Sequence, residues 1–470
     1  MQTESIDYGD DAGARRLFLL RLVVVAALGG LLFGYDTAVV SGAIIYVRQD
    51  FNLSAAAVGW TVSAALVGAA FGAAFAGRAS DRFGRKLTLI VAAILFLGTA
   101  IGSAMADSLA LLLIMRAIGG IGVGIVSVVS PLYLSEVAPA RLRGGLVSTY
   151  QLALTVGMLL VYLVNYLIAT SGTVEWDIAY GWRWMFASQA VPAAILLGAL
   201  LTVPESPRWL FFHGQRDKAA AILKRILAPT DVANELHNMG DIQDTHETRT
   251  GSRYSPAVRR IVVIGVLLAV FQQVSGINVL LYFAPQIFET VTGAGADFAL
   301  LETIIIGVAN LTFTLVALFT VDKFGRRILM LIGFAIMGIC IAIIGVAIYL
   351  NAVGPLLILL VIGYVAGFAV AVGPVTWVIL SEIFPARIRG TAVGIALMAN
   401  WLANVAVSQT FAQMDSNAWL IAVFNHAFPF LLYAGFCLLA VIFVYRFIPE
   451  TKGRSLEDIE ASELGGQSAT

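Results

Sequence analysis

Twelve apolar runs of about 20 residues follow one another along the chain, and they constrain its fold more than any other feature, because a helix of that length crosses the hydrocarbon core of a bilayer. Of the 470 residues, 59% are hydrophobic and 12% are charged, whereas about a quarter of the residues in a soluble domain are charged. The sequence therefore predicts an all-α membrane protein with twelve transmembrane helices. The runs lie at 22–46, 54–77, 87–106, 109–134, 145–169, 184–203, 261–288, 300–321, 328–350, 355–381, 391–413 and 419–446.

A polar stretch interrupts the series after the sixth run and leaves six runs on either side. Part of this stretch, 217–227, is rich in Ala, Lys and Arg, which favours short helices. The sequence thus predicts two six-helix bundles joined by a cytoplasmic helical linker, and no separate soluble enzyme domain fits. The predicted divisions are an N-terminal tail 1–21, a first bundle 22–203, a linker 204–260, a second bundle 261–447 and a C-terminal tail 448–470.

The distribution of basic residues predicts the orientation. An even number of spans places both termini on one side of the membrane. Of the 29 Lys and Arg residues, Arg48 and Arg183 fall in loops on the other side and Arg116 falls inside a run, and all the rest lie on the side of the termini. The positive-inside rule makes that side the cytoplasm. We therefore expect a multi-pass protein of the cell inner (plasma) membrane with both termini cytoplasmic.

Composition and motif spacing argue against several other classes of protein. The 29 basic residues balance the 29 acidic ones, so no global field favours nucleic acid. Cys340 and Cys437 fall inside apolar runs and are interpreted as packing residues. The four histidines lack metal-ligand spacing, and the glycines at 119–124 have no preceding strand. We expect no metal, no cofactor, no nucleic-acid partner and no enzymatic activity.

Three motifs of the first half return in the same order about 245 residues later, which indicates duplication. Repeated six-span halves are typical of secondary transporters, which bind substrate between the halves near the bilayer midplane. The pairs are Asp81-Arg82-Phe83-Gly84-Arg85 with Asp322-Lys323-Phe324-Gly325-Arg326, Leu134-Ser135-Glu136 and Arg141-Leu142-Arg143-Gly144 with Leu380-Ser381-Glu382 and Arg387-Ile388-Arg389-Gly390, and Pro204-Glu205-Ser206 with Pro449-Glu450-Thr451.

These motifs, with Gln272-Gln273-Val274-Ser275-Gly276-Ile277-Asn278 in the seventh run, resemble the sugar porter family of the major facilitator superfamily over essentially the whole chain. The resemblance is strongest to bacterial proton-coupled xylose, galactose and glucose symporters. It implies a monomeric importer of a monosaccharide with a proton, working in the lipid bilayer by alternating access. Two alternatives stay open, a facilitative uniporter of the same fold and a non-transporting sugar sensor, although a sensor is expected to carry a longer signalling tail.

Side-chain amides in the predicted spans suit a sugar, because an amide both donates and accepts hydrogen bonds, as a hydroxyl does. The alternative interpretation is that amides in spans join helices to one another. The resemblance favours sugar binding and adds Trp377, whose indole matches a sugar-facing position. The substrate-binding set is Gln151, Gln272, Gln273, Asn278, Asn310, Trp377 and Asn400.

The other tryptophans divide into two groups. Trp401, next to Asn400, is a candidate for lining the same cavity. Five others are interpreted as anchors at the membrane interface, where indole is enriched. They are Trp60, Trp176, Trp182, Trp184 and Trp419.

Two charged residues lie inside predicted spans, where charge is costly, so they form a functional hypothesis. Asp36 matches the carboxylate of proton-coupled members of the family, and Arg116 matches its partner. A nearby arginine favours the ionised carboxylate and burial favours the protonated one. A rearrangement that separates the two residues would therefore promote protonation of Asp36. The alternative is a permanently ionised structural pair.

The repeated motifs also place acids among the bases at the predicted cytoplasmic helix ends. Topology explains the bases but not the acids. The resemblance implies salt bridges that hold these ends together in the outward-facing state, and the alternative is solvated helix ends that contribute little to stability. The set is Asp81, Arg82, Arg85, Glu136, Arg141, Arg143, Glu205, Arg208, Asp322, Arg326, Glu382, Arg387, Arg389 and Glu450.

The identity of the sugar depends on two positions. In the family, the position of Asn400 carries Asn in glucose transporters and Gln in the bacterial xylose transporter. Met158 replaces a polar residue of that xylose protein with an apolar one. These positions favour a hexose, glucose first, with xylose, galactose, arabinose and inositol as alternatives.

Overall fold

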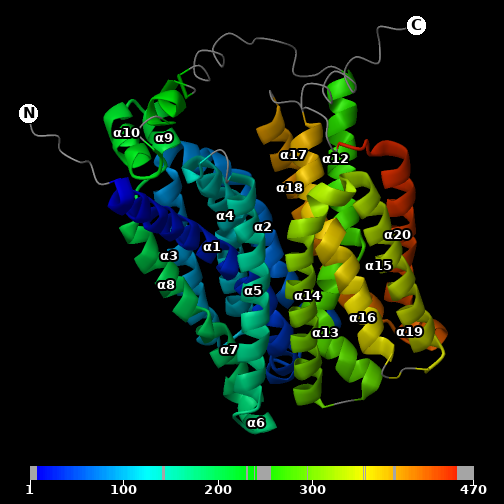
Figure 1. The fold of residues 1–470 in the computed structure, drawn as a ribbon. Helices are drawn as coiled ribbons and strands as arrows, with labels where there is room; N and C mark the ends of the chain where they lie inside the picture. Colours follow the sequence, from blue (N-terminus) through cyan, green and yellow to red (C-terminus); the bar gives the residue numbers. More distant parts are fainter. Residues whose placement is uncertain are drawn as a thin grey trace, which may run out of the picture.

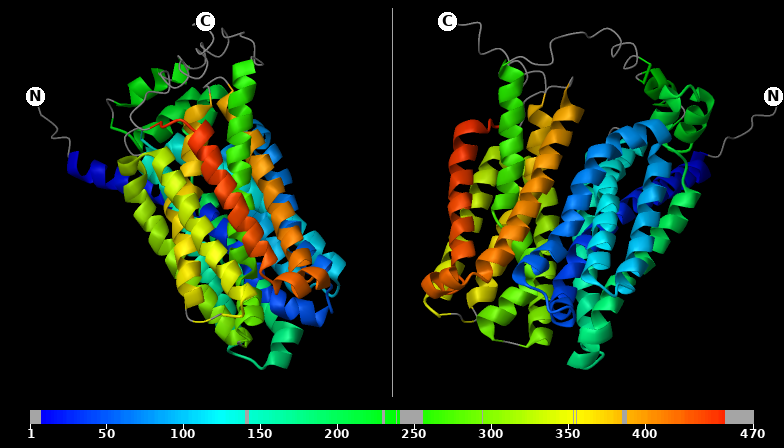
Figure 2. Two further views of the ribbon diagram at one scale, coloured as in Figure 1. Left: turned by 90° about the vertical axis from the view of Figure 1, so that its right-hand side faces the viewer. Right: turned by 180° about the vertical axis from the view of Figure 1, so that it is seen from behind.

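The computed structural model describes residues 8–139, 143–228, 231–237, 239–240, 256–293, 295–352, 354, 356–384 and 388–451. Within these ranges twelve helical segments are long and apolar enough to cross a membrane, and no strand occurs. The predicted all-α fold with twelve spans is therefore confirmed. The helices stand side by side in two groups of six, with the first six spans in one group and the last six in the other (Figures 1 and 2).

The first group contains five long helices and a sixth span built from several short segments. These are α1 (Tyr8–Asp50), α2 (Ala55–Phe83), α3 (Arg85–Ala104), α4 (Leu109–Val137), α5 (Arg143–Ala169), and the sixth span with α6 (Val174–Trp176), a π-helical turn η1 (Asp177–Gly181), α7 (Trp182–Ser188) and α8 (Ala190–Thr202). The linker follows with the short helices α9 (Pro207–Phe212) and α10 (Arg216–Lys224) and a further helical segment at 231–237.

The second group has two interrupted spans, the seventh and the tenth. Its segments are α12 (Pro256–Val274) and α13 (Ile277–Thr292), α14 (Ala296–Phe324), α15 (Arg326–Tyr349), then α16 (Leu356–Gly367) with a π-helical turn η2 (Phe368–Val372) and α17 (Gly373–Ile383), α18 (Arg389–Asp415), α19 (Ala418–Phe424) and α20 (Phe428–Phe447).

Three predicted span starts differ clearly from the structure. The first span begins at Gly13 rather than at residue 22. The sixth span begins at Val174 rather than at residue 184, because the apolar segment is extended by the short α6 and the turn η1. The twelfth span begins at Phe428 rather than at residue 419. Asn425 and His426 both adopt positive φ angles, 48° and 63°, and this left-handed backbone ends α19 before α20 begins.

The interpretation of Trp182 as an interfacial anchor is wrong. Its side chain is fully buried, and its indole Nε1 donates to Oδ2 of Asp50 at 3.1 Å. The guanidinium of Arg183 stacks over the same indole, 4.0 Å from the ring centroid. Trp182 therefore fastens the sixth span to the end of α1 instead of facing the membrane surface. Trp60, Trp184 and Trp419 are exposed.

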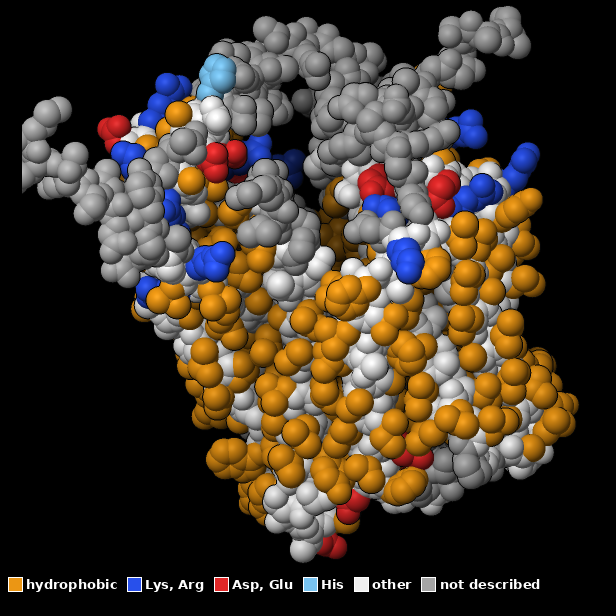
Figure 3. Space-filling model, in the orientation of Figure 1, with side chains coloured by type: hydrophobic (Ala, Val, Ile, Leu, Met, Phe, Trp, Pro, Cys, Tyr) orange, Lys and Arg blue, Asp and Glu red, His pale blue; other side chains and the backbone are white. Residues whose placement is uncertain are grey.

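The two ends of the bundle differ. We call the end that carries α9 and α10 the linker end and the opposite one the far end (Figure 1). Lys and Arg side chains gather at the linker end, whereas hydrophobic side chains cover most of the rest of the face shown in Figure 3. This distribution suits a protein whose sides face lipid.

The two groups meet mainly along α2 with α18 and α5 with α14. Toward the far end these contacts are close. A β-carbon on Gly59 of α2 would lie 2.6 Å from Oε1 of Gln409 on α18, and the hydroxyl of Tyr162 donates to the carbonyl of Leu281 at 3.0 Å. At the linker end the helices of the two groups diverge, and the surface is hollowed between them (Figures 2 and 3).

Candidate functional site

The predicted amide motif of the seventh span lies at a break between two helices. Val274 ends α12 and Ile277 begins α13, with Gly276 between them at φ 89°. A β-carbon there would lie 2.6 Å from the ring of Tyr433, so both the backbone angle and the space require glycine. The hydroxyl of Tyr364 donates to the carbonyl of Ser275 at 2.7 Å. The break therefore has a fixed geometry.

Four of the predicted substrate-binding residues form one hydrogen-bonded amide cluster around this break, with Asn278 half-buried and the other three buried. Asn400 of α18 donates from Nδ2 to Oε1 of Gln272 at 2.9 Å and to the carbonyl of Ala269 at 2.8 Å. Its Oδ1 accepts from Nε2 of Gln273 at 3.1 Å. Asn278 then donates to Oε1 of Gln273. The amide cluster, Gln272, Gln273, Asn278 and Asn400, joins both halves of the seventh span to α18.

The amide cluster also reaches the interrupted tenth span. Nε2 of Gln272 donates to the carbonyls of Val372 and Gly373, at 3.1 Å each, where η2 meets α17. Pro374 follows at the first turn of α17 and lacks a backbone N–H, so the helix is readily bent at this point. Each amide donor and acceptor here is able to exchange its protein partner for a hydroxyl group.

The remaining predicted substrate-binding residues lie apart from the amide cluster. Gln151 on α5 and Trp377 on α17 are half-buried, and neither hydrogen-bonds to the amide cluster within the described ranges. Asn310 of α14 is buried and places its Nδ2 3.9 Å from Sδ of Met158 on α5, so it contacts the other group of helices. The structure thus brings four of the seven residues together.

Asp36 and Arg116 lie together in the interior of the first group, each 3% exposed. Arg116 donates from Nη1 to the backbone carbonyl of Asp36 at 3.2 Å, and the same nitrogen lies 3.7 Å from Oδ2 of the carboxylate. The guanidinium also lies over the ring of Phe186, 5.5 Å from its centroid. A buried ion pair of this kind is expensive to separate, because either partner alone would be an uncompensated charge.

Sequence reasoning missed three polar residues near these sites. Gln189 donates from Nε2 to Oδ1 of Asp36 at 2.9 Å. On α18, Asn404 donates to the hydroxyl of Tyr282 at 3.3 Å. No motif marks these positions. The only sequence signal for Gln189 is that a side-chain amide occurs inside an apolar run.

Trp401 connects the two groups of helices. Its ring lies 5.6 Å, centroid to centroid, from that of Phe33 on α1. It is buried, and its indole Nε1 has no hydrogen-bond partner among the described residues. A buried unpaired donor next to Asn400 is suited to a ligand acceptor.

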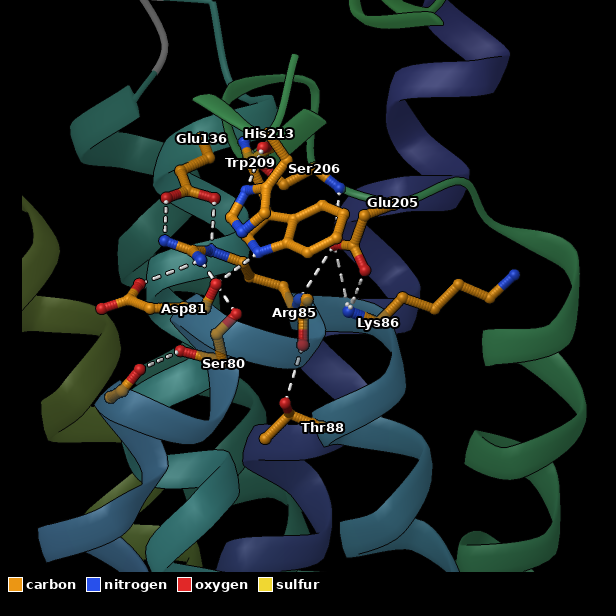
Figure 4. Close-up of polar contacts among 12 residues, drawn as sticks. Ser80, Asp81, Arg85, Lys86, Thr88, Glu136, Glu205, Ser206, Trp209 and His213 are labelled. Atoms are coloured by element: carbon orange, nitrogen blue, oxygen red, sulfur yellow. Dashed lines mark hydrogen bonds and ion pairs between the residues drawn. The ribbon is translucent and has the colours of Figure 1, made fainter. Parts of the chain in front are cut away.

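At the linker end of the first group, Arg85 holds two helices together (Figure 4). Its Nε and Nη2 donate to the two carboxylate oxygens of Glu136 on α4 at 2.9 Å each. Its Nη1 forms an ion pair with Oδ1 of Asp81 at 3.0 Å and donates to the carbonyl of Ser80 at 3.0 Å. Such a two-pronged arginine–carboxylate pair is among the stronger hydrogen-bonded arrangements in proteins.

Glu205 occupies the start of α3 in the same region (Figure 4). Its carboxylate accepts the backbone N–H groups of Arg85 at 2.9 Å, Lys86 at 3.1 Å and Ser206 at 2.7 Å. An acidic side chain at a helix N-terminus is favourable because it meets the free N–H groups and the helix dipole. Burial raises the pKa of Glu205 above its usual range, and the three N–H groups and Arg85 oppose that shift.

The second group repeats this arrangement. Glu450 accepts the backbone N–H groups of Arg326 at 2.9 Å and Arg327 at 3.2 Å, at the start of α15. Arg326 pairs with Glu382 at 3.3 Å, and Thr451 donates to the same carboxylate at 2.6 Å. The echo seen in the sequence is therefore also an echo in hydrogen bonding.

The ion pairs among the described residues of the predicted gate set each lie within one group of helices. Arg82 is exposed, with its guanidinium 5.4 Å from the ring centroid of Phe83. Arg141 and Arg387 lie outside the described residues, and the side chains of Arg143, Asp322 and Arg389 are not described. Nor do the described residues contain a cluster of three His, Cys, Asp or Glu side chains able to hold a metal ion.

Comparisons with known proteins cover nearly the whole chain. Residues 22–462 match the family model described as "Sugar (and other) transporter". The chain is 46% identical over 470 residues to the D-xylose-proton symporter of Escherichia coli (strain K12), covering 94% of this chain and 95% of that protein. It is 41% identical over 445 residues to the arabinose-proton symporter of Bacillus subtilis, with 94% of each covered. A solved inward open conformation of the E. coli xylose transporter aligns with a TM-score of 0.84 at 43% identity, covering 95% of this chain and all of that one.

Proposed function

The chain belongs to the sugar transporter family, and on that basis we propose that it is a transporter, not an enzyme, that imports a monosaccharide together with a proton. The observation that carries the proton part of the proposal is the buried pair Asp36–Arg116. Ionisable residues inside membrane spans are energetically costly and therefore usually mark functional sites. The xylose and arabinose symporters described above, which are both named for proton coupling, support it.

The proposed architecture has two moving bundles. We assign the bundles to 22–203 and 261–447, the linker to 204–260, and the tails to 1–21 and 448–470. The divergence of the helices at the linker end and the close contacts at the far end support an inward-facing state, as does the similarity to an inward open structure. The bundles rock around the site between them, so that the far end opens when the linker end closes.

The protein is proposed to lie in the cell inner (plasma) membrane, with the linker end facing the cytoplasm. The basic side chains gathered there support this, because Lys and Arg are retained on the cytoplasmic side. Both termini would then be cytoplasmic. The protein is proposed to act as a monomer within the bilayer, since the paired bundles already enclose one complete site.

We propose that the sugar binds to the amide cluster together with Gln151, Asn310 and Trp377. In the present state the amides satisfy one another, so a sugar hydroxyl replaces an amide–amide contact instead of meeting an unpaired group. Trp401, whose indole N–H has no partner in the part of the chain that the structure describes, supplies a further donor. The exchange keeps buried polar groups paired, which limits the cost of binding and release.

The gate residues at the linker end are proposed to rearrange during the cycle. In the inward-facing state their ion pairs stay within one bundle, as with Arg85–Glu136 and Arg326–Glu382. In the outward-facing state the helix ends meet, and acids of one bundle then face bases of the other. The proposal for the full set of gate residues rests on the family resemblance and on the repeated motifs.

Transport in proteoliposomes tests the proton coupling. With an imposed pH difference, acidic outside, the unmodified protein is expected to accumulate sugar above the external concentration. Asp36→Asn, which mimics the neutral carboxyl group, should lose this accumulation and retain sugar binding and equilibrium exchange, since the amide cluster is unchanged. A protein that ignores the pH difference is a facilitative uniporter, and one that binds sugar without exchange is a sensor.

The sugar itself is proposed to be a hexose, with a pentose as the alternative. Asn400 and Met158 support a hexose, whereas both relatives are named for pentoses. Counterflow with glucose, galactose, xylose, arabinose and inositol decides between them. Glucose or galactose should compete best, and a clear preference for xylose or arabinose would assign the protein to pentose transport.

A further inference from the structure

The two carboxylate oxygens of Asp36 have different surroundings. Oδ1 accepts a hydrogen bond from Nε2 of Gln189 at 2.9 Å. Oδ2 is buried and has no hydrogen-bond partner among the described residues. The nearest cationic nitrogen, Nη1 of Arg116, lies 3.7 Å from Oδ2, beyond hydrogen-bond distance, and donates instead to the backbone carbonyl of Asp36. One oxygen is therefore held and the other is left without a donor.

Gln189 is placed by an interruption of the sixth span. α7 ends at Ser188 and α8 begins at Ala190, so Gln189 lies between the two helices and is 2% exposed. The hydroxyl groups of Ser188 and Tyr35 lie 2.7 Å apart. Two consecutive residues at the interruption thus contact two consecutive residues of α1, and of these two only Gln189 contacts the carboxylate of Asp36.

The other groups around the carboxylate come from three helices. Arg116 faces it from α4 and Tyr282 from α13, and these are the charged and titratable groups that act on it within the described ranges, together with its own neighbour Tyr35. A β-carbon at Gly119 on α4 would lie 3.5 Å from Oδ1, in ordinary van der Waals contact. The donor to Oδ1 is the uncharged amide of Gln189.

We propose, on the basis of the proton coupling proposed above, that Gln189 is the positioning residue of the proton site and that Oδ2 of Asp36 is the atom that takes the proton. A proton from water on the open side forms an O–H bond with Oδ2 and neutralises the carboxylate. When the opposite side opens, this bond breaks and the proton returns to water there. The amide of Gln189 has no titrating group of its own, so it holds Oδ1 in both states.

The amide should also set the pH range of transport. A hydrogen bond to an ionised oxygen favours the ionised form. Without the amide donor, the carboxyl group keeps its proton to higher pH. The loss of uptake that follows as the external pH rises should then move to more alkaline values, by about one to two pH units.

Three variants test this at a fixed pH difference. Gln189→Leu removes the amide and should shift the alkaline limb of the uptake profile upward. Gln189→Glu keeps the shape but sets a second carboxyl group against Asp36, so that the two share a proton, and it should shift the limb in the same direction. Ser188→Ala is the matched control, because the Ser188 hydroxyl contacts Tyr35 and the carbonyl of Met185 but not the carboxylate of Asp36, so its loss should leave the profile in place.

Sugar affinity and equilibrium exchange, measured on the same preparations, separate positioning from folding. If Gln189→Leu fails to fold, Gln189→Glu decides. Variants that bind sugar normally but keep the unmodified pH profile overturn the proposal, as does an equal shift in Ser188→Ala. A purely structural role predicts slower transport at every pH without a shift. An unmodified protein that does not respond to the pH difference refutes the proton coupling itself, which is a separate outcome.

Discussion

The backbone at Gly84 approaches the carboxylate of Glu205 so closely that a β-carbon at Gly84 would meet Oε2 of Glu205. Gly84 has φ 96° and ψ 158°, a region that is essentially restricted to glycine. The contact permits Glu205 to accept the first N–H groups of α3. Gly325 repeats the conformation at φ 91° beside Glu450. Each bundle therefore has the same glycine–glutamate junction at its linker end.

We expect Gly84→Ala to destabilise the protein by about 1–3 kcal/mol, through backbone strain and displacement of Glu205. The control is Gly77→Ala on α2, where a β-carbon meets nothing within 4 Å. Thermal unfolding in detergent should show a lower Tm for Gly84→Ala and an unchanged or slightly higher Tm for Gly77→Ala. Equal melting of both variants would mean that the junction does not contribute to stability.

Substitutions in the amide cluster are predicted to lower the affinity for sugar. Gln273→Ala and Asn278→Ala each remove hydrogen-bonding groups from a desolvated site, which typically costs about 1–3 kcal/mol, or about ten- to hundredfold in affinity. Gln49→Ala is a suitable control, because within the described ranges the Gln49 amide bonds only to the carbonyl of Ile45 on its own helix. Calorimetry with the purified proteins measures the effect. Unchanged affinity in both variants would remove the seventh span from the binding site.

The contact between α2 and α18 predicts which substitution blocks closure of the far end. Gly59→Phe should hold the two bundles apart there, because a β-carbon at Gly59 already lies 2.6 Å from Oε1 of Gln409 and 3.3 Å from Cβ of Ala412. We expect sugar binding from the far side to persist and transport to fall to background. Gly98→Phe, at a position with nothing within 4 Å, should transport normally. Normal transport by Gly59→Phe would contradict alternating access through this interface.

Much of the fold follows from the sequence because hydropathy is summed over about 20 residues and tolerates local irregularity. The predicted start of the sixth span lies too late in the sequence, because Glu175, Asp177 and Arg183 lower the hydropathy of the segment before it. Asp177 is nevertheless buried in the π-helical turn. α19 ends at the left-handed backbone of Asn425, and the side-chain amide of Asn425 donates to the carbonyl of Ile348 at 2.8 Å. Such tertiary contacts leave no periodic signal.

The candidate site was predictable where motifs repeat and hidden where single side chains act. Glu205 and Glu450 stand in matching motifs, so their common role is visible in the sequence. Gln189 is one amide in an apolar run, and only the interruption between α7 and α8 brings it to Asp36. The contact of Asn278 with Gln273 likewise needs the break at Gly276, because five residues apart on a continuous helix the two side chains do not face each other.

Arg116 provides the last prediction, since it should behave differently from Asp36. Arg116→Gln removes the positive charge that favours the ionised carboxylate, so Asp36 keeps its proton when the linker end opens and release becomes slow. Net uptake should fall strongly even with a pH difference, as is expected for Asp36→Asn.

The two variants should differ in their response to alkaline pH inside the vesicle. That condition should partly restore Arg116→Gln, because release from Asp36 is then driven, but it leaves Asp36→Asn inactive, because that variant has no proton to release. Arg116→Lys keeps a charge and should retain part of the activity. Sugar affinity at a pH where all forms bind confirms that each protein is folded. Recovery of both inactive variants at alkaline internal pH, or of neither, would show that Arg116 does not act through the protonation of Asp36.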